Sequence, residues 1–342
     1  MIIPVEKYFD SAMTFSKEEV NIAQRCSEWL PDEIIDVHAH CNAAAHVLDL
    51  PEAIFRHMMS TFPWYTIEQS QRAKSLLFPG KSVRTIRFAH APKGIDHKSA
   101  NDYLVEQCPP GDRVALYGIP DDPDYTRTQL ESGQYVALKA YYLYFVPAAK
   151  TIYEYFPPET LEVTQALGLP IILHLPTMIT TSLEQLEQLV RDFPRQKVVL
   201  AHLGLPHLPV PGLEEAYARA AAHESVVMDT AMIPSAEVVA MALNAFGSQR
   251  IMFGSDEPVN LIRAVVFDHP TKGQRLAARG YHWVDPEDEA AYGHLADSAV
   301  HMHWQALMAV RDGVTKAYAA QDRQESALRE IFAENARHHF GM

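Results

Sequence analysis

The chain has 342 residues, of which 48% are hydrophobic and 21% are charged, as in an ordinary globular protein. Its 29 Lys and Arg against 43 Asp and Glu give a net charge of −14, which argues against binding to nucleic acid because phosphate backbones are also negative. No apolar run approaches the roughly 20 residues of a membrane span, and the start lacks the pattern of a signal peptide. Three cysteines, Cys26, Cys41 and Cys108, are typical of a reducing compartment, so we expect a cytoplasmic protein without a membrane partner.

Along the chain, short apolar segments alternate with amphipathic ones. Residues 1–33 are predicted to form a charged, helical lead-in, because Ser16-Lys17-Glu18-Glu19 is a capping-box pattern that opens a helix through Trp29. The predicted strands are 34–40, 83–89, 113–119, 134–142, 170–175, 197–201, 225–228 and 250–254. The predicted helical or amphipathic segments are 51–60, 66–77, a short helix around 101–104, 158–167, 181–193, 212–222 and 235–246.

Eight strands that alternate with helices indicate parallel βαβ units, and eight such units close a barrel. We therefore predict an α/β fold, a (β/α)8 TIM barrel with an N-terminal lead-in and extra C-terminal helices, as a single domain over 1–342 with its core at about 34–256. Residues 257–295 are rich in Pro, Asp, Glu, Tyr and His and are predicted to form a long loop after the eighth strand. This loop is a candidate lid, and through 257–300 we expect a homo- or hetero-oligomer.

Several predicted strands end in a residue that can bind a metal. His38 and His40 follow Ile34-Ile35-Asp36-Val37, and side chains two apart in a strand point to the same side, so this pair can hold one ion. Because active sites of such barrels lie at the carboxyl ends of the strands, the similar positions later in the chain should converge on the same mouth. The predicted metal site consists of His38, His40, Lys139, His174, His202 and Asp256.

Other polar residues near these motifs have more ordinary explanations. Cys41 follows His40 but should have left the strand, so we do not expect it to be a ligand. Glu257 is either a salt-bridge residue or an additional outer ligand, and His90 is a core or substrate-contacting residue. The aromatic run 141–145 either lines a pocket or packs under the next helix. We expect the remaining late histidines at the surface or at an interface: His269, His282, His294, His301 and His303.

Asp-Val-His-Ala-His at 36–40, His174, Ala-His-Leu-Gly at 201–204 and Gly-Ser-Asp at 254–256 resemble the metal-dependent amidohydrolase superfamily. The most similar branch is the amidohydrolase-related group that includes aminocarboxymuconate-semialdehyde decarboxylase. Asn335-Ala336 also resembles the closing helix of that group. The resemblance covers about residues 34–340 and implies a metal-dependent barrel, but it does not imply a substrate, because this superfamily includes hydrolases, decarboxylases and hydratases.

The resemblance implies that His38, His40, His174 and Asp256 bind a first divalent metal, with His202 beside it and Asp256 also accepting a proton from water. In binuclear relatives, a lysine at the end of the fourth strand is carbamylated and bridges two ions. Lys139 lies in an apolar strand, where an unpaired charge is costly, so a carbamylated Lys139 and a lysine paired with a nearby acid or a substrate carboxylate both remain open. In the carbamylated case, His174 and His202 would bind the second ion.

We therefore predict an enzyme in which a metal-activated water attacks a small amide, ester or lactone, with Asp256 and His202 as the catalytic residues. One alternative is a decarboxylase of a small carboxylate. Another is an oxygen-activating hydroxylase subunit that resembles the two-subunit 2-aminoisobutyrate hydroxylases. His and Asp ligands suit Zn as well as Mn or Fe; zinc alone in the isolated protein would indicate ordinary hydrolysis, and iron with manganese would favour the hydroxylase. The non-enzyme alternative is a silent barrel that supports a partner subunit.

Overall fold

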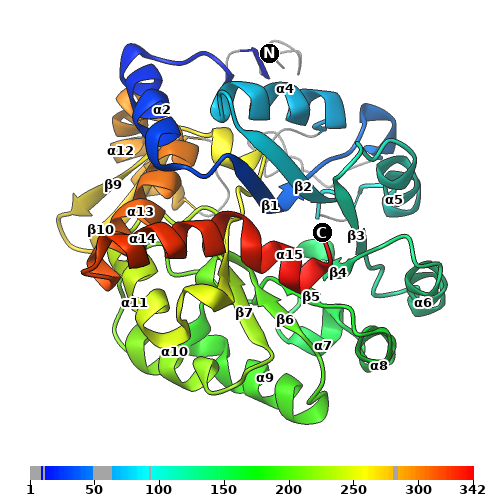
Figure 1. Ribbon diagram of the computed structural model, residues 1–342. Helices are drawn as coiled ribbons and strands as arrows, with labels where there is room; N and C mark the ends of the chain where they lie inside the picture. The colour runs from blue at the N-terminus through cyan, green and yellow to red at the C-terminus, as the bar shows by residue number, and fades with distance from the viewer. Residues whose placement is uncertain (1–8, 11, 49–63, 92–93, 146, 280–283) are drawn as a thin grey trace.

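A computed structural model describes residues 9–10, 12–48, 64–91, 94–145, 147–279 and 284–342 (Figure 1). Eight parallel strands are paired in the same order as they occur in the chain, which confirms the predicted α/β barrel. The strands are β1 (Glu33–His40), β2 (Ser82–Phe88), β3 (Arg113–Tyr117), β4 (Ala137–Ala140), β5 (Ile171–Leu173), β6 (Val198–Leu200), β7 (Val226–Asp229) and β8 (Ile251–Met252).

The barrel is nearly closed by backbone contacts between β1 and the residues that follow β8. The N–H of Val37 donates to the carbonyl of Phe253 at 3.0 Å, and the N–H of Asp256 donates to the carbonyl of His38 at 2.8 Å. Ala39 and Glu257 form a parallel bridge beyond these bonds. The segment that carries Asp256 is therefore hydrogen-bonded directly to the strand that carries His38.

Helices surround the strands, as Figure 1 shows, because each presents one apolar face to the sheet. The first, α2 (Lys17–Trp29), begins with the predicted capping box between Ser16 and Glu19. The others around the barrel are α4 (Ile67–Leu77), α5 (His97–Glu106), α6 (Pro123–Glu131), α7 (Ile152–Tyr155), α8 (Pro158–Leu167), α9 (Ile179–Asp192), α10 (Leu213–Ala221) and α11 (Ala236–Phe246). The predicted segment 51–60 lies outside the described residues.

The barrel interior is filled by apolar side chains from the strands together with the carboxyl-terminal segment. The strand members of this buried cluster are Ile35, Val37, Ile86, Phe88, Ala115, Ala137, Ile172, Val199, Val227 and Met252. Ala333 from the π-helical turn η7 (Glu330–Glu334), and Ala336 and Phe340 from α15 (Asn335–Phe340), pack in the same cluster. In Figure 1, α15 (red) lies across one end of the barrel. The segment around Asn335 therefore closes one end of the fold.

The segment after β8 is more ordered than the long loop that we predicted. It contains the antiparallel pair β9 (Ala264–His269) and β10 (Gly273–Ala278), then α12 (Pro286–Tyr292), before the helices α13 (Met302–Ala317) and α14 (Gln321–Arg329). The expected surface position is wrong for His301 and His303, which are buried. The ring nitrogen Nδ1 of His301 contacts Glu19, and that of His303 contacts the Asn260 amide. His282 lies outside the described residues.

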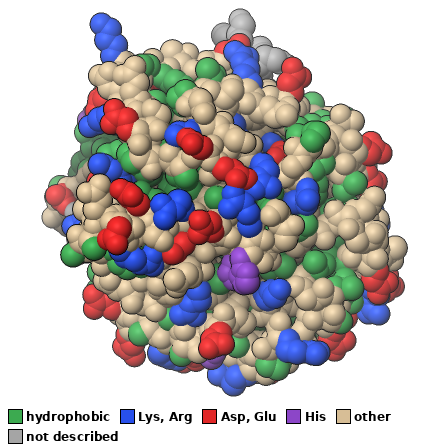
Figure 2. Space-filling view, in the orientation of Figure 1, with side chains coloured by type: hydrophobic (Ala, Val, Ile, Leu, Met, Phe, Trp, Pro, Cys, Tyr) green, Lys and Arg blue, Asp and Glu red, His purple; other side chains and the backbone are tan. Residues whose placement is uncertain are grey.

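On the face shown in Figure 2, acidic and basic side chains are interspersed rather than gathered into one patch. None of the helices in the described part of the chain combines the length and the apolar character needed to cross a membrane. Cys26, Cys41 and Cys108 are free thiols, and the first two are buried.

Candidate metal centre

The predicted site residues all lie at or just beyond the carboxyl ends of barrel strands. His38 and His40 belong to β1 and Lys139 to β4. His174 directly follows β5, His202 lies in the turn η3 (Ala201–Gly204) after β6, and Asp256 follows β8. All are buried except His174, which is partly exposed. The barrel thus brings residues from five strands to one mouth.

A bulge in β1 determines which way its polar residues point. The pairing of β1 with β2 shifts register between Asp36 and Ala39, and such a shift changes which side successive residues face. Asp36 consequently bonds to Lys74 on α4, outside the sheet, whereas His38 faces His202 and Asp256 in the mouth. In a regular strand, Asp36 and His38 would point to the same side.

Two close groups of possible ligands share His38. In one group, Oδ1 of Asp256 lies 3.3 Å from Nε2 of His38 and 3.2 Å from Nε2 of His40. In the other, His38 lies with His202 and Asp229. Three atoms bound to one ion at about 2.0–2.2 Å must lie close to one another, and the first group has this arrangement.

His174 belongs to neither close group among the described residues, but its ring is adjacent to them. The ring centroids of His174 and His202 are 5.1 Å apart, and those of His202 and His38 are 4.8 Å apart. The mouth therefore holds a continuous row of imidazoles from β1, β5 and β6.

The hydrogen bonds of the four histidines favour the same tautomer. In each ring Nδ1 lies near an oxygen, which makes it the protonated nitrogen and leaves a lone pair on Nε2. These oxygens are Oδ2 of Asp229 for His38 (2.9 Å), the carbonyl of Ala89 for His40 (3.1 Å), the carbonyl of Leu175 for His174 (2.8 Å) and the carbonyl of Ala231 for His202 (3.1 Å). Neutral imidazoles with an open Nε2 are the form in which histidine binds a metal, so the donor set fits a divalent ion.

The pKa values of the mouth residues favour neutral imidazoles, with the exception of His38. Burial lowers the pKa of His202 to about 4 and that of His40 below its ordinary value. Burial opposes the charge on Asp256, yet His202 and the bonded histidines hold its pKa well below the usual range. His38 is the exception, because the carboxylate of Asp229 outweighs burial and raises its pKa. The shifts therefore favour neutral rings for His40 and His202 beside an ionised Asp256.

Lys139 is buried beside this group. Its Nζ has no hydrogen-bond partner among the described residues and lies 5.1 Å from the ring centre of Phe88. Burial lowers its pKa to about 8, although Asp229 and Asp256 oppose this shift. The alternative in which Lys139 pairs with a nearby acid has no support among the described contacts, whereas carbamylation and pairing with a substrate carboxylate remain open.

The neighbouring residues take the more ordinary roles. Glu257 forms the expected salt bridge, with Lys74 at 3.3 Å, and Cys41 lies 3.6 Å from a guanidinium nitrogen of Arg87. The ring of His90 stacks on His40 at 5.4 Å.

The aromatic run contributes to the wall of the mouth. The rings of Tyr141 and Tyr142 pack against His174, with centroids 4.6 and 5.3 Å from it. Both tyrosines are partly exposed. Of the two interpretations of this run, the pocket wall is therefore supported for these two residues, whereas Tyr144 is buried.

Asp229 is the site residue that the sequence analysis missed. It is the last residue of β7, so it occupies the same kind of position as the predicted ligands. One oxygen bonds to Nδ1 of His38, and the other accepts the backbone N–H of His202 at 2.9 Å. The pattern Val226-Val227-Met228-Asp229, an apolar strand that ends in an acid, was the available signal.

Solved structures with the same fold include three informative relatives. An amidohydrolase from Burkholderia multivorans with bound zinc is 16% identical (TM-score 0.53), and the match covers 90% of this chain and 99% of that one. The probable 2-pyrone-4,6-dicarboxylic acid hydrolase from Acinetobacter baumannii is 15% identical (TM-score 0.54; 90% and 99%). A dihydroxybenzoic acid decarboxylase from Polaromonas sp. JS666, with bound manganese and the inhibitor 2-nitroresorcinol, is 15% identical (TM-score 0.53; 91% and 97%).

At these identities the likeness shows the barrel fold and leaves the substrate open. No curated protein sequence matches the chain. The model of one protein family, described as Amidohydrolase, matches residues 35–342, which include every residue of the candidate centre. The chain therefore belongs to the Amidohydrolase family.

Proposed function

We propose that this protein is a metal-dependent hydrolase of a small amide, ester or lactone. The observation that carries the proposal is the shared orientation of His38, His40, His174 and His202, each with Nδ1 bonded to an oxygen, together with the approach of the Nε2 atoms of His38 and His40 to one carboxylate oxygen of Asp256. Two imidazole nitrogens that converge on one ionised carboxylate oxygen are suited to bind a cation.

His38, His40 and Asp256 would hold a divalent ion, with His174 or His202 completing the set. The ion would supply Lewis acidity and a water of lowered pKa. Zinc, manganese and iron all suit these donors, and the Burkholderia and Polaromonas relatives have bound zinc and manganese, respectively.

The chain's own residues then have distinct tasks. Asp256 is ionised and buried, so it can accept a proton from water next to His40. His202 is neutral with its proton on Nδ1, so its Nε2 can bind the ion or accept a proton. It can donate to a developing oxyanion only after it has gained a proton, because an open nitrogen has no hydrogen to donate. The burial of Asp256 and His202 strengthens both interactions.

The second candidate is decarboxylation of a small aromatic carboxylate. The partly exposed rings of Tyr141 and Tyr142 beside His174 offer a flat wall on which a planar substrate can stack. The Polaromonas relative is a dihydroxybenzoic acid decarboxylase. The hydroxylase alternative and the oligomer through 257–300 stay predictions, because no described contact favours either.

Metal analysis combined with substrate profiling tests the proposal. We expect the purified protein, after loading with Zn²⁺ or Mn²⁺ and removal of free ion, to retain stoichiometric metal and to hydrolyse members of a panel of esters, lactones and amides. His40→Ala should lose the metal and the activity, whereas His223→Ala, which alters a histidine remote from the mouth, should keep both. Release of carbon dioxide from hydroxybenzoates without hydrolysis would favour the second candidate. A wild-type protein that retains no divalent ion would overturn both.

A further inference from the structure

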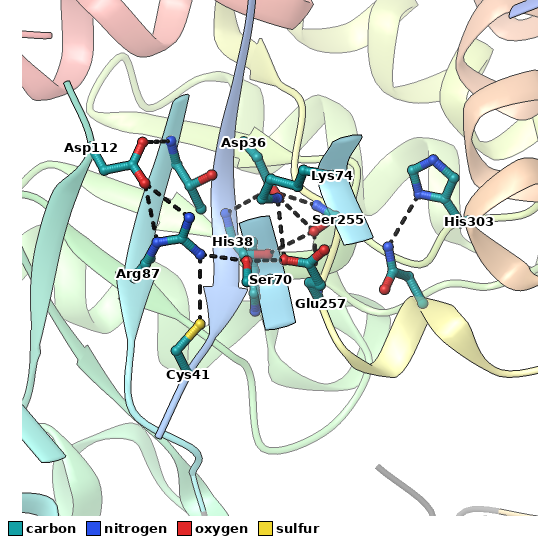
Figure 3. A network of polar contacts seen from close by, with 12 residues as sticks. Asp36, His38, Cys41, Ser70, Lys74, Arg87, Asp112, Ser255, Glu257 and His303 are labelled. Carbon is teal, nitrogen blue, oxygen red and sulfur yellow. Dashed lines mark hydrogen bonds and ion pairs between the residues drawn. The ribbon is translucent and has the colours of Figure 1, made fainter. Parts of the chain in front are cut away.

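A buried polar cluster lies behind the metal-binding candidates, between β1, α4 and the residues after β8 (Figure 3). Its members, which we call the clamp, are Asp36, Ser70, Lys74, Ser255 and Glu257, and all are buried. Only Glu257 was considered in the sequence analysis, as a salt-bridge residue or an additional outer ligand. The clamp is nevertheless connected to three of the candidate ligands through their backbone.

The two neighbours of Asp256 are both held by the clamp. Ser255 donates from its hydroxyl to Oδ2 of Asp36 at 2.6 Å and from its backbone N–H to Oδ1 at 2.9 Å. Oε2 of Glu257 accepts a hydrogen bond from Ser70 at 2.6 Å and pairs with Nζ of Lys74 at 3.3 Å. Asp256 therefore lies between two residues whose side chains are hydrogen-bonded or ion-paired to the clamp.

The backbone of Asp256 needs this support. Its φ is +61°, in the left-handed region where a residue with a side chain is strained relative to glycine. Strained residues persist where the surrounding structure determines them, and they concentrate at functional sites. Here the carboxylate of Asp256 contacts His38 and His40 in this conformation. The flanking contacts of Ser255 and Glu257 fix the residues on either side of it, and its own N–H donates to the carbonyl of His38.

Lys74 lies between the two carboxylates of the clamp. Its ammonium group bonds to Oδ2 of Asp36 and also contacts Glu257. Burial opposes its charge, but these two carboxylates raise the pKa of Lys74 above its ordinary value, so it remains a cation. Without it, two buried carboxylates would face each other with no shared counter-ion, which is unfavourable in a dry environment.

The same cluster also holds β1, the strand that carries His38 and His40. Oδ1 of Asp36 accepts the backbone N–H of His38 at 3.1 Å, and the carbonyl of Glu257 accepts the backbone N–H of His40 at 2.7 Å. Arg87, which is paired with Asp112, donates to Ser70 and extends the cluster toward β3. The clamp thus contacts the backbone of both histidines of β1 as well as the segment of Asp256.

We propose that Lys74 is a positioning residue, which through Asp36 and Glu257 sets the spacing of His38, His40 and Asp256 for metal binding. This inference rests on the proposed function, because it assigns the clamp to that centre. Outer residues that orient metal ligands contribute strongly to affinity, and their loss typically weakens metal binding by about 10–100-fold. A buried ion cluster that served only the fold would affect stability and leave the affinity of the folded protein unchanged.

Metal titration of folded variants tests the proposal. We expect Lys74→Met and Ser255→Ala to weaken the binding of Mn²⁺ and of Zn²⁺ by about 10-fold or more, and Lys74→Arg to restore much of it, because arginine keeps a cation between the carboxylates. The control is Arg323→Met, which removes the ion pair of Arg323 with Glu330 in the carboxyl-terminal helices and should leave affinity unchanged. Ser70→Ala is the milder variant if Lys74→Met does not fold.

Hydrogen exchange of the metal-free protein gives a second readout that does not depend on an ion. We expect faster exchange in peptides that cover 34–42 and 253–262 in the Lys74 and Ser255 variants, and no change there in the Arg323 variant. If folded clamp variants have wild-type affinity for metal and wild-type hydrogen exchange, the proposal that the clamp positions the ligands is overturned. A wild-type protein that binds neither ion overturns the proposed function instead, and the exchange comparison then still decides whether Lys74 positions the Asp256 segment.

Discussion

Asp229 and His38 form a buried pair in which a carboxylate oxygen lies 2.9 Å from the imidazole Nδ1. The second oxygen of Asp229 accepts the backbone N–H groups of His202 and Ala231, so one carboxylate orients two of the candidate ligands. Burial opposes its ionisation, but His38 lowers the pKa of Asp229. A carboxylate behind a metal-binding histidine fixes the tautomer and makes the ring a stronger donor.

Replacing this carboxylate by its neutral isostere should weaken metal binding. We expect Asp229→Asn to fold but to bind Mn²⁺ or Zn²⁺ about 10–100-fold more weakly, because an amide can place an N–H instead of an oxygen against Nδ1 of His38. Equilibrium titration of the metal-free protein measures the effect. Glu330→Gln, which neutralises an acid in the carboxyl-terminal segment, is the control. Equal affinities for Asp229→Asn and wild type would mean that Asp229 does not orient His38.

Most of the candidate centre could be predicted from the sequence, because parallel strands bring their carboxyl ends to one mouth. That rule requires only a short apolar run followed by a polar residue, and it located His174, His202 and Asp256 at the mouth. The same rule applied to Val226–Asp229 and would have included Asp229. The opposite directions of Asp36 and His38 were not predictable, because they follow from a bulge and a bulge depends on the partner strand.

Elements outside the repeating pattern were harder to predict. The hairpin of β9 and β10 has no tight two-residue turn signal, and α6 begins at Pro123 in a polar stretch with little apolar periodicity. The burial of His301 follows from its contacts with Glu19 and with Phe15, which lie almost 300 positions earlier in the chain. No local pattern encodes such contacts, so the prediction of a surface histidine failed there.

The buried His97 should make stability depend on pH. Burial lowers its pKa to about 4, below the value of about 6.5 in an unfolded chain. The unfolded state therefore binds more protons between pH 6.5 and 4, and the free energy of unfolding falls as pH decreases through this window. Between pH 6.5 and pH 5, a span of one and a half pH units, the free energy of unfolding should fall by about 2 kcal/mol.

Comparison with His97→Phe isolates this contribution. His97 stacks on Tyr117 with ring centroids 4.1 Å apart, and phenylalanine can keep this stacking without titrating. We expect the free energy of unfolding, measured with urea, to fall between pH 7 and pH 5 by about 2 kcal/mol more in wild type than in the variant. The same loss in both proteins would show that other groups cause the pH dependence.

Lys139 should react with carbon dioxide. A neutral amine adds to carbon dioxide to form a carbamate and releases one proton. The buried Nζ of Lys139 has no partner among the described residues, and so none of them forms an ion pair that would hold the proton. Lys74 is the internal comparison, because its contacts with Asp36 and Glu257 keep it charged. With ¹³C-bicarbonate we expect one carbamate signal in the NMR spectrum, strengthened by divalent metal and absent in Lys139→Met. A signal that survives this substitution would assign it to another amine, and its absence in wild type would leave a single-ion centre.

The carboxyl-terminal helix should contribute to stability without contributing to the centre. Phe340 is buried in the cluster that fills the barrel, and Asn335 donates from its side-chain amide to the carbonyls of Ser248 and Ile251 at 2.7 Å each. We expect Phe340→Ala to lower the free energy of unfolding by about 3–5 kcal/mol, since it opens a cavity in a packed interior. Leu167→Ala, at a side chain that is 46% exposed, should change it by less than about 0.5 kcal/mol. Because the amide of Asn335 bonds to Ser248, which precedes β8, and to Ile251, its first residue, α15 is joined to the start of β8, and the folded Phe340→Ala protein should bind metal with wild-type affinity. A joint loss of stability and affinity would instead mean that packing at this end of the barrel is transmitted along β8 to Asp256.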